Sequence, residues 1–245
     1  MKAMIFAAGL GTRLRPLTDT CPKALVKING IPLLEIAIKR LIRYGFAEII
    51  INIHHFGEQV LQFLADNKNF GVTIKISDER ARLLETGGAL KKARHLLEDE
   101  PFLVCNADVL TNMDLKTFYE THCQSNALAT LAVRKRKTSR YLQFDDKNIL
   151  TGWKNVKTAE TKTSRVAKTT VDWAFSGIHV IHPDIFDYMP TTQKFSIIDV
   201  YLQAAKERII KAYPHDENIW LDVGKIDSLP QAEKLLPLIK FMPEK

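Results

Sequence analysis

The sequence predicts a three-layer α/β/α fold, built on a mostly parallel, Rossmann-like sheet with a small β lid. Short apolar runs rich in β-branched residues alternate with longer stretches of helical period. The strand candidates are apolar on both faces, as in parallel sheets that helices cover on both sides. Because 245 residues suit one large domain, we expect a single domain over 1–245 in which 134–173 form a lid or subdomain.

The alternation of strands and helices is clearest in the first half of the chain. Strands are predicted at 3–8, 48–53, 72–77, 101–106 and 127–133, and helices at 32–44, 56–67, 89–97 and 115–124. Segment 134–173 is polar and rich in turns, with short strands at 141–144 and 149–153. Beyond it, strands are predicted at 174–181, 209–213 and 219–223. Helices are expected at 196–207, capped by Ser196, and from a cap at Asp227 to residue 236.

Composition narrows the class of protein. Hydrophobic residues make up 46% and charged residues 26%, as in soluble globular proteins. The net charge of +7 suits an anionic partner, but the basic run at 134–140 has no interleaved aromatic residues, so we expect no nucleic-acid partner. No segment has the roughly 18 apolar residues of a membrane span. The three cysteines lack a C-x-x-C spacing, which favours the cytoplasm.

A glycine loop follows the first predicted strand. It reads AAGLGTRLRPLTDTCPKALVKI over residues 7–28. Gly9 and Gly11 allow a sharp turn that brings N–H groups near an anion, and Arg13 and Lys23 supply positive charge. Neither the dinucleotide fingerprint nor the P-loop pattern fits this spacing. The loop is therefore predicted to cradle phosphates.

Two aspartates stand at strand ends. Asp108 follows the apolar stretch FLVCNA and Asp222 ends the stretch IWLD. If both converge on one crevice they suit Mg²⁺, which binds through one or two carboxylates together with substrate phosphates. Strand-end aspartates also serve as helix caps, so the residues alone leave both readings open.

A second pair of glycines occurs later in the chain. In the stretch ETGGA, Gly87 and Gly88 precede a helix expected from Ala89, and Thr86 is a suitable N-cap for a simple helix entry.

The motifs together resemble those of the sugar-1-phosphate nucleotidyltransferases. GLGTRLRP…PKALV is similar to the signature loop of that family, and LLETGGAL, LVCNADVL, FSGIHVIHP and WLDVGKIDSLPQAE follow it in family order. Together the segments look closest to the N-acetylmuramate 1-phosphate uridylyltransferases of bacterial cell-wall recycling. The resemblance implies the nucleotide-diphospho-sugar transferase fold and the transfer of a nucleoside monophosphate from UTP to N-acetylmuramic acid 1-phosphate, with release of pyrophosphate.

The resemblance also implies roles for individual residues. Arg13 and Lys23 would be catalytic, and Asp108 and Asp222 would hold Mg²⁺. The nucleotide would contact Ala8, Gly9, Gly11, Thr12, Arg13, Lys23, Thr86, Gly87, Gly88 and Asn106. The sugar would contact Gly152, Lys154, Ser176 and Gly177. Lys154 stands where many members carry an E-K-P lysine, but here the stretch reads GWKNVKTAE.

Three alternatives stay open on the sequence. The first is another nucleotide-sugar pyrophosphorylase, such as a mannose-1-phosphate guanylyltransferase. The second is a phosphocholine cytidylyltransferase, in which Trp153 and Trp173 would enclose the quaternary ammonium. The third is a catalytically silent nucleotide-binding subunit. We expect a monomer or homodimer.

Overall fold

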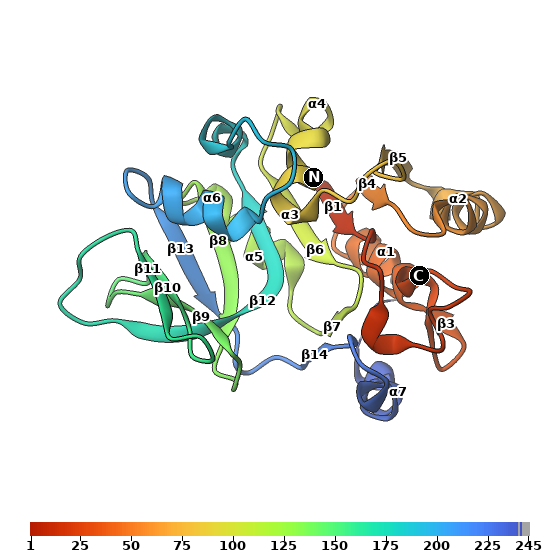
Figure 1. Ribbon diagram of the computed structural model, residues 1–245. Helices are drawn as coiled ribbons and strands as arrows, with labels where there is room; N and C mark the ends of the chain where they lie inside the picture. The colour runs from red at the N-terminus through yellow and green to blue at the C-terminus, as the bar shows by residue number, and fades with distance from the viewer. Residues whose placement is uncertain (240, 242–245) are drawn as a thin grey trace. The chain divides into compact units, whose positions relative to one another are not determined.

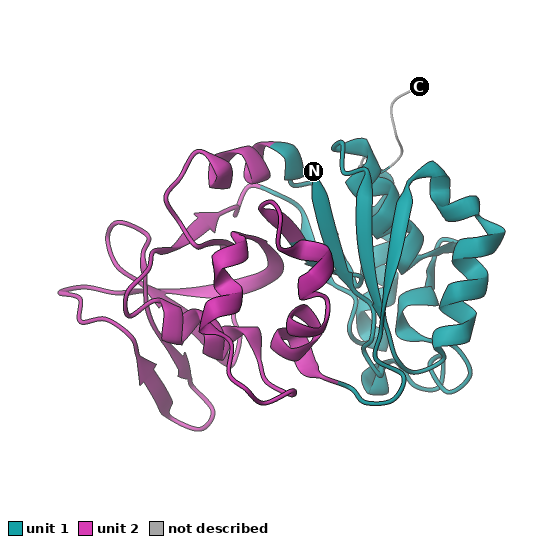
Figure 2. Ribbon diagram, turned by 90° about the horizontal axis from the view of Figure 1, so that it is seen from above, with its two compact units in different colours: residues 1–83, 104–116, 218–245 teal, residues 84–103, 117–217 magenta. Residues whose placement is uncertain are grey.

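The structure is a computed structural model that describes residues 1–239 and 241. The chain forms two compact units, shown in different colours in Figure 2. Unit 1 contains residues 1–83, 104–116 and 218–245, and unit 2 contains residues 84–103 and 117–217. Segment 134–173 lies entirely in unit 2.

Unit 1 carries the parallel part of the sheet, in the order β6-β1-β4-β5 (Figure 1). Its strands are β1 (Lys2–Phe6), β4 (Glu48–Ile53), β5 (Thr73–Asp78) and β6 (Phe102–Asn106), which enters the unit at Val104. β1 pairs in parallel with β4, and β4 with β5. β4 is buried from Ile49 to Ile53, as its run of isoleucines predicts, and the buried stretch includes the polar Asn52. The strands expected at 3–8, 48–53, 72–77 and 101–106 are confirmed.

The helices of unit 1 are α1 (Leu33–Arg43), α2 (Gly57–Asp66) and α7 (Leu229–Leu235). α1 buries an apolar stripe of helical period and ends before Gly45, whose φ of +83° is the left-handed conformation that closes many helices. Short 3₁₀ helices lie at Thr12–Leu14, Lys23–Leu25, Lys68–Gly71, Ile226–Ser228 and Leu236–Leu238. The predicted cap at Asp227 is wrong, because that residue lies inside a 3₁₀ turn and α7 begins two residues later.

Two small ribbons of unit 1 were not predicted as such. β2 (Lys27–Ile28) and β3 (Ile31–Pro32) form a hairpin whose turn residues, Asn29 and Gly30, both have positive φ. β7 (Val109–Thr111) pairs antiparallel with β14 (Trp220–Asp222). The strand expected at 219–223 thus exists, but it forms a ribbon with the segment that follows Asp108.

Unit 2 contains a mixed sheet in the order β11-β10-β9-β12, and β8 pairs with both β12 and β13. β8 and β13 pair in parallel, whereas β10 pairs antiparallel with β9 and β11, and β12 pairs antiparallel with β8 and β9. The strands are β8 (Ala129–Arg134), β9 (Arg140–Phe144), β10 (Leu150–Asn155), β11 (Glu160–Thr163), β12 (Val171–Ile181) and β13 (Ile210–Pro214). Residues 134–173 therefore fold into an antiparallel sheet, of which β11 was not predicted.

The helices of unit 2 are α3 (Glu85–Lys92), α4 (Arg94–Leu97), α5 (Leu115–Cys123), which begins in unit 1, and α6 (Ile197–Ala204). A 3₁₀ helix lies at Pro183–Tyr188. Ser196 caps α6 as predicted, because its Oγ accepts a hydrogen bond from Ile198 N at 3.2 Å. The single helix expected at 89–97 is wrong: α3 begins at Glu85, and Ala93 separates it from α4.

None of the helices in the described part of the chain combines the length and apolar character that a bilayer crossing requires.

Candidate functional site

The glycine loop leaves β1 at Phe6 and turns at Gly11, whose φ is +66°. The Gly11 carbonyl accepts hydrogen bonds from Leu14 N and from Thr18 Oγ1, each at 2.8 Å. A Cβ at this position would lie 2.8 Å from Thr18 Cγ2 and 3.0 Å from Lys23 Cβ. Both the backbone angle and the space available therefore require glycine here.

A cavity of about 280 Å³ opens along this loop. Gly9 and Thr12 are exposed in its wall, whereas the preceding Ala8 is buried. Its lining joins backbone to two cationic side chains and comes from Gly9, Leu10, Gly11, Thr12, Arg13, Lys23, Leu83 and Gly224. The predicted loop residues are thus gathered around one opening in unit 1.

Lys23 and Asp108 form an ion pair beside this cavity. Lys23 begins the 3₁₀ turn Lys23–Leu25, and its Nζ donates to Asp108 Oδ2. Both side chains are largely buried, at 17% and 13% exposure. A buried ion pair is weakly screened by solvent, so each charge fixes the position of the other.

The β7–β14 ribbon brings Asp222 to the same place. Asp222 is the register partner of Val109, and Val223 N donates to the backbone oxygen of Asp108 at 2.9 Å. A Cβ at Gly224 would lie 2.5 Å from Asp222 Oδ1 and 2.8 Å from Arg13 Nη2, so both side chains lie against this glycine. The four charged residues selected from the sequence (Arg13, Lys23, Asp108 and Asp222) are therefore brought together within unit 1.

The donor set of this cluster fits Mg²⁺. It offers two carboxylates, because Asp222 is the register partner of Val109, the residue that follows Asp108. Magnesium is bound in many proteins by one or two carboxylates, with phosphates and waters as the other ligands. Asp108 and Asp222 are therefore the residues that would hold the ion.

Arg40 is a residue of this region that the sequence analysis missed. It is fully buried on α1, and its Nη1 donates to Val109 O at 3.0 Å, next to Asp108. Its Nε and Nη2 have no hydrogen-bond partner among the described residues, and burial lowers the pKa of the guanidinium. An arginine on the otherwise apolar face of a predicted helix was the available signal.

Asn106 ends β6 and is half-buried. Directly after it, Ala107 N donates to Phe6 O at 3.1 Å, which ties this strand end to the start of the glycine loop. Asn106 therefore lies next to the residue that contacts the start of the glycine loop, and two residues before Asp108.

The ETGG segment lies in unit 2, inside α3. Thr86 is not an N-cap, because it is the second residue of the helix and its Oγ1 accepts a hydrogen bond from Ile197 N. The N–H groups of Gly87 and Gly88 both donate to Phe195 O, at 2.9 and 3.3 Å. A Cβ on Gly87 would lie 2.4 Å from the Phe195 ring, and one on Gly88 would lie 2.0 Å from Gln193 O. Packing against 193–195 therefore explains why both residues are glycine.

The residues expected to bind the sugar lie on two strands of unit 2. Gly152 and Lys154 are on β10, where a Cβ at Gly152 would lie 2.7 Å from Lys162 O. Lys154 Nζ forms an ion pair with Asp172. The lysine is thus held on the sheet rather than extended into solvent.

Ser176 and Gly177 are on β12. Ser176 is 1% exposed, its hydroxyl bonds His215 Nε2 at 2.7 Å, and Gly177 has a φ of +73°. Burial lowers the pKa of His215 to about 4, and the Arg134 charge adds to the effect, so its imidazole is neutral at pH 7.

Each of the two tryptophans that could form a choline cage has a lysine ammonium group over its ring. Lys162 Nζ lies 5.4 Å from the Trp153 ring centroid, and Lys135 Nζ lies 5.6 Å from that of Trp173. These contacts already provide each indole with a cation. This arrangement disfavours the phosphocholine alternative.

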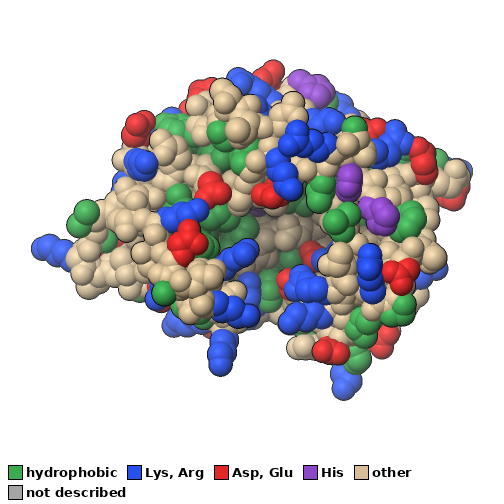
Figure 3. Space-filling model, viewed as in Figure 1, with side chains coloured by type: hydrophobic (Ala, Val, Ile, Leu, Met, Phe, Trp, Pro, Cys, Tyr) green, Lys and Arg blue, Asp and Glu red, His purple; other side chains and the backbone are tan. Residues whose placement is uncertain are grey.

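Figure 3 shows Asp and Glu side chains scattered among Lys and Arg side chains on one face of the molecule.

Comparison with known proteins places the chain in a family. The family model for nucleotidyl transferases matches residues 2–237. The chain belongs to the nucleotidyl transferase family. It is 32% identical over 235 residues to an N-acetylmuramate alpha-1-phosphate uridylyltransferase of Neisseria meningitidis, covering 96% of this chain and 98% of the relative. It is also 31% identical over 237 residues to a mannose-1-phosphate guanyltransferase of Yarrowia lipolytica, covering 92% of this chain but only 61% of that relative.

A solved structure shows the same fold. A Bacillus anthracis crystal structure assigned as a glucose-1-phosphate thymidylyltransferase matches with a TM-score of 0.80 at 20% identity, covering 96% of this chain and 94% of that one. The predicted fold class, and the prediction of a nucleotidyltransferase enzyme related to those acting on sugar 1-phosphates, are thereby confirmed.

Proposed function

We propose that this nucleotidyltransferase moves the uridylyl group of UTP to N-acetylmuramic acid 1-phosphate and releases pyrophosphate. The observation that carries the proposal is the cluster of Arg13, Lys23, Asp108 and Asp222 beside the glycine loop of unit 1. A loop with exposed backbone, two cations and two carboxylates suits a triphosphate and its metal ion.

The reaction breaks one bond and forms another at the α-phosphorus. A phosphate oxygen of the sugar 1-phosphate attacks it, the bond to the bridging oxygen of the β-phosphate breaks, and pyrophosphate leaves with the electron pair. Phosphoryl chemistry of this kind depends mainly on positioning and on offsetting negative charge. No covalent bond to the protein is required.

The loop residues would bind the leaving part of the nucleotide. The backbone of Ala8, Gly9, Gly11 and Thr12 would cradle the β- and γ-phosphates, and Arg13 would neutralise their charge. Lys23 would move from Asp108 to the phosphate oxygens near the α-phosphorus. Mg²⁺ held by Asp108 and Asp222 would supply Lewis-acid charge neutralisation when bound.

The remaining roles concern the base and the sugar. Thr86, Gly87 and Gly88 are proposed to contact the base. Because the two glycine N–H groups bond Phe195 O, other atoms of this segment would make the base contacts. Asn106 would contact the ribose or the sugar. On the sugar side the proposed residues are Gly152, Lys154, Ser176 and Gly177.

Support for the substrate pair comes from the Neisseria relative, whose name states it, and whose whole length the chain nearly spans. GTP with mannose 1-phosphate is the second candidate, because the Yarrowia guanyltransferase has almost the same identity. We further propose a cytoplasmic enzyme of cell-wall recycling that acts as a monomer or homodimer without a nucleic-acid partner.

A pyrophosphate-release assay tests the proposal. Each of the four common ribonucleoside triphosphates is paired with a panel of sugar 1-phosphates, with and without Mg²⁺. Release should occur only when nucleotide, Mg²⁺ and sugar phosphate are all present. A complete panel without release would refute the proposed activity and favour a silent nucleotide-binding protein.

A further inference from the structure

Two buried polar side chains stand at the carboxyl ends of neighbouring strands in unit 1. Asn52 interrupts the apolar run of β4 and is 3% exposed, and Glu79 follows β5 and is 1% exposed. A buried amide or carboxylate destabilises a protein unless its hydrogen bonds are made. Their position in an otherwise apolar layer calls for a specific role.

Asn52 connects the glycine loop to Glu79. Its Oδ1 accepts a hydrogen bond from Ala7 N at 2.7 Å, and its Nδ2 donates to Glu79 Oε1 at 2.7 Å. A carboxylate only accepts, so it orients the amide with its NH₂ group toward Glu79 and its oxygen toward Ala7. Glu79 and the Ala7 N–H therefore both favour the same orientation of the Asn52 amide.

The N–H that Asn52 binds belongs to the first residue of the glycine loop. β1 ends at Phe6, so Ala7 is where the chain turns away from the sheet toward Gly9 and Gly11. Asn52 is the register partner of Phe6 and can reach this point from the neighbouring strand. The hydrogen bond fixes the direction in which the loop leaves the sheet.

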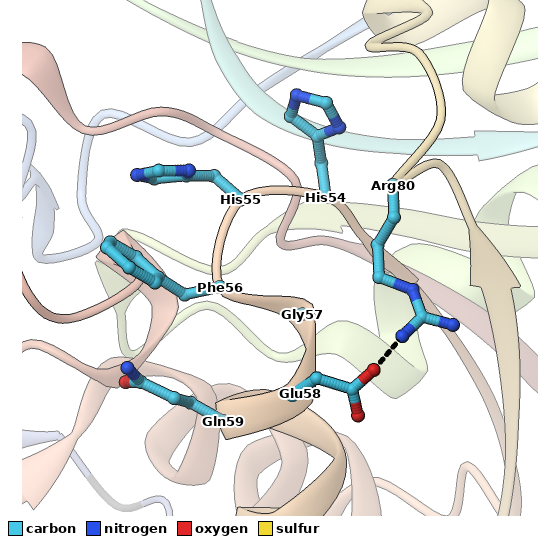
Figure 4. A pocket seen from close by; sticks show the side chains of 7 residues that line it. All are labelled: His54, His55, Phe56, Gly57, Glu58, Gln59 and Arg80. Atoms are coloured by element: carbon cyan, nitrogen blue, oxygen red, sulfur yellow. Dashed lines mark hydrogen bonds and ion pairs between the residues drawn. The ribbon is translucent and has the colours of Figure 1, made fainter.

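Glu79 is itself held in place from several sides. Its N–H donates to Ile53 O at 2.8 Å, and its carbonyl oxygen lies 2.7 Å from His54 Nδ1. The next residue, Arg80, directs its guanidinium to Glu58 and Asp78 (Figure 4 shows the contact with Glu58). The carboxylate of Glu79 thus turns inward to Asn52 while the neighbouring arginine is paired on the exposed side.

We propose that Asn52, oriented by Glu79, is the positioning residue of the phosphate loop. Neither side chain lines the cavity along that loop, so both act on the nucleotide through the backbone of Ala7 and the residues after it. This inference rests on the proposed function for its effect on catalysis, but the effect on the loop does not depend on that function.

An exchanged pair of substitutions tests the proposal. In Asn52→Asp alone, a second carboxylate faces Glu79 and repels it. In the double variant Asn52→Asp with Glu79→Gln, the carboxylate at position 52 again accepts from Ala7 N, and the amide at position 79 donates to it.

We expect Asn52→Ala and Asn52→Asp to lower kcat/KM for the nucleotide by about tenfold or more, the effect of leaving one buried donor without a partner. The double variant should return to within about threefold of wild type, and the KM for the sugar phosphate should change little in all of them.

Hydrogen exchange of the peptide that contains Ala7, measured by mass spectrometry, reports on the loop without any reaction. Exchange should be about tenfold faster in Asn52→Ala and near wild type in the double variant. Unchanged exchange in Asn52→Ala, or a double variant as impaired as Asn52→Asp at equal thermal stability, would overturn the proposal. If Asn52→Asp does not fold, Asn52→Ala is the single variant with which the double variant is compared. If wild type is inactive while the exchange pattern holds, the proposed function fails and the positioning role stands.

Discussion

Replacing Gly11 with alanine tests whether the glycine loop holds Lys23 in place. At a φ of +66° alanine costs about 1–2 kcal/mol in backbone energy. The new Cβ also lies 2.8 Å from Thr18 Cγ2 and 3.0 Å from Lys23 Cβ, and relieving such overpacking costs roughly 1–3 kcal/mol. We therefore expect Gly11→Ala to lower the free energy of unfolding by about 2–5 kcal/mol. Displacement of Lys23 should lower kcat/KM by about 10²-fold, because misplacement by about 1 Å can have this effect.

Gly30→Ala is the matched control. Gly30 has a φ of +80°, but a Cβ there meets no atom of the described residues within 4 Å. Gly30→Ala should therefore lower the free energy of unfolding by the backbone cost alone, and its kinetics should be normal. Adding Thr18→Ser to Gly11→Ala removes the closest contact, Cγ2, and should recover part of both losses. Urea unfolding and pyrophosphate release measure the two effects. A Gly11→Ala variant that behaves like Gly30→Ala in both would show that the space around Gly11 does not position Lys23.

Three further predictions follow from the same contacts. Asp108→Asn and Asp222→Asn should each remove most activity and weaken Mg²⁺ binding, which calorimetry with nucleotide present would measure. The control variant Asp227→Asn should change neither property. Normal turnover of a variant at low Mg²⁺ would show that the substituted aspartate is not a metal ligand. Lys23→Ala should lower kcat by about 10²-fold, whereas Lys27→Ala, at an exposed position, should not. An effect on KM alone would mean that Lys23 binds the substrate and the transition state equally well. The free energy of unfolding should fall as pH is lowered from about 6.5 toward 3, because burial lowers the pKa of three histidines and the unfolded chain binds protons that the folded chain excludes. The pKa values are about 4 for His122, 3 for His179 and 4 for His215. The free energy of unfolding should change by up to about 1.4 kcal/mol per pH unit for each of these histidines. Urea titrations in which stability does not fall at acid pH would contradict these pKa values.

The parallel core could be predicted because its signals are local. The isoleucine run of β4 and the amphipathic period of α1, with Gly45 after it, identify their elements without knowledge of the rest of the chain. The β2–β3 hairpin also has a local signal, because Asn29–Gly30 is a typical turn sequence. By contrast, the start of α3 at Glu85 depends on packing of Gly87 and Gly88 against 193–195, which lies about a hundred residues away in sequence.

The site divides in the same way. The glycine loop, Lys23, Asp108 and Asp222 were selected from sequence, and the structure brings them together. What pattern could not show was how Asp222 arrives, because the β7–β14 ribbon joins segments far apart in the chain. Asn52 was hidden for a similar reason: a single polar residue in an apolar strand gives no indication of its partners until Ala7 and Glu79 are placed beside it.

Competition between substrates tests the substrate pair and the transfer reaction in one experiment. The protein is given all four ribonucleoside triphosphates, Mg²⁺ and a mixture of sugar 1-phosphates that includes those of N-acetylmuramic acid, mannose and glucose, and the products are separated and weighed by mass spectrometry. We expect UDP-N-acetylmuramic acid as the dominant product, with one pyrophosphate released for each molecule formed. A dominant GDP-mannose would contradict the substrate assignment, and the absence of any nucleotide-sugar product would contradict the transfer reaction itself.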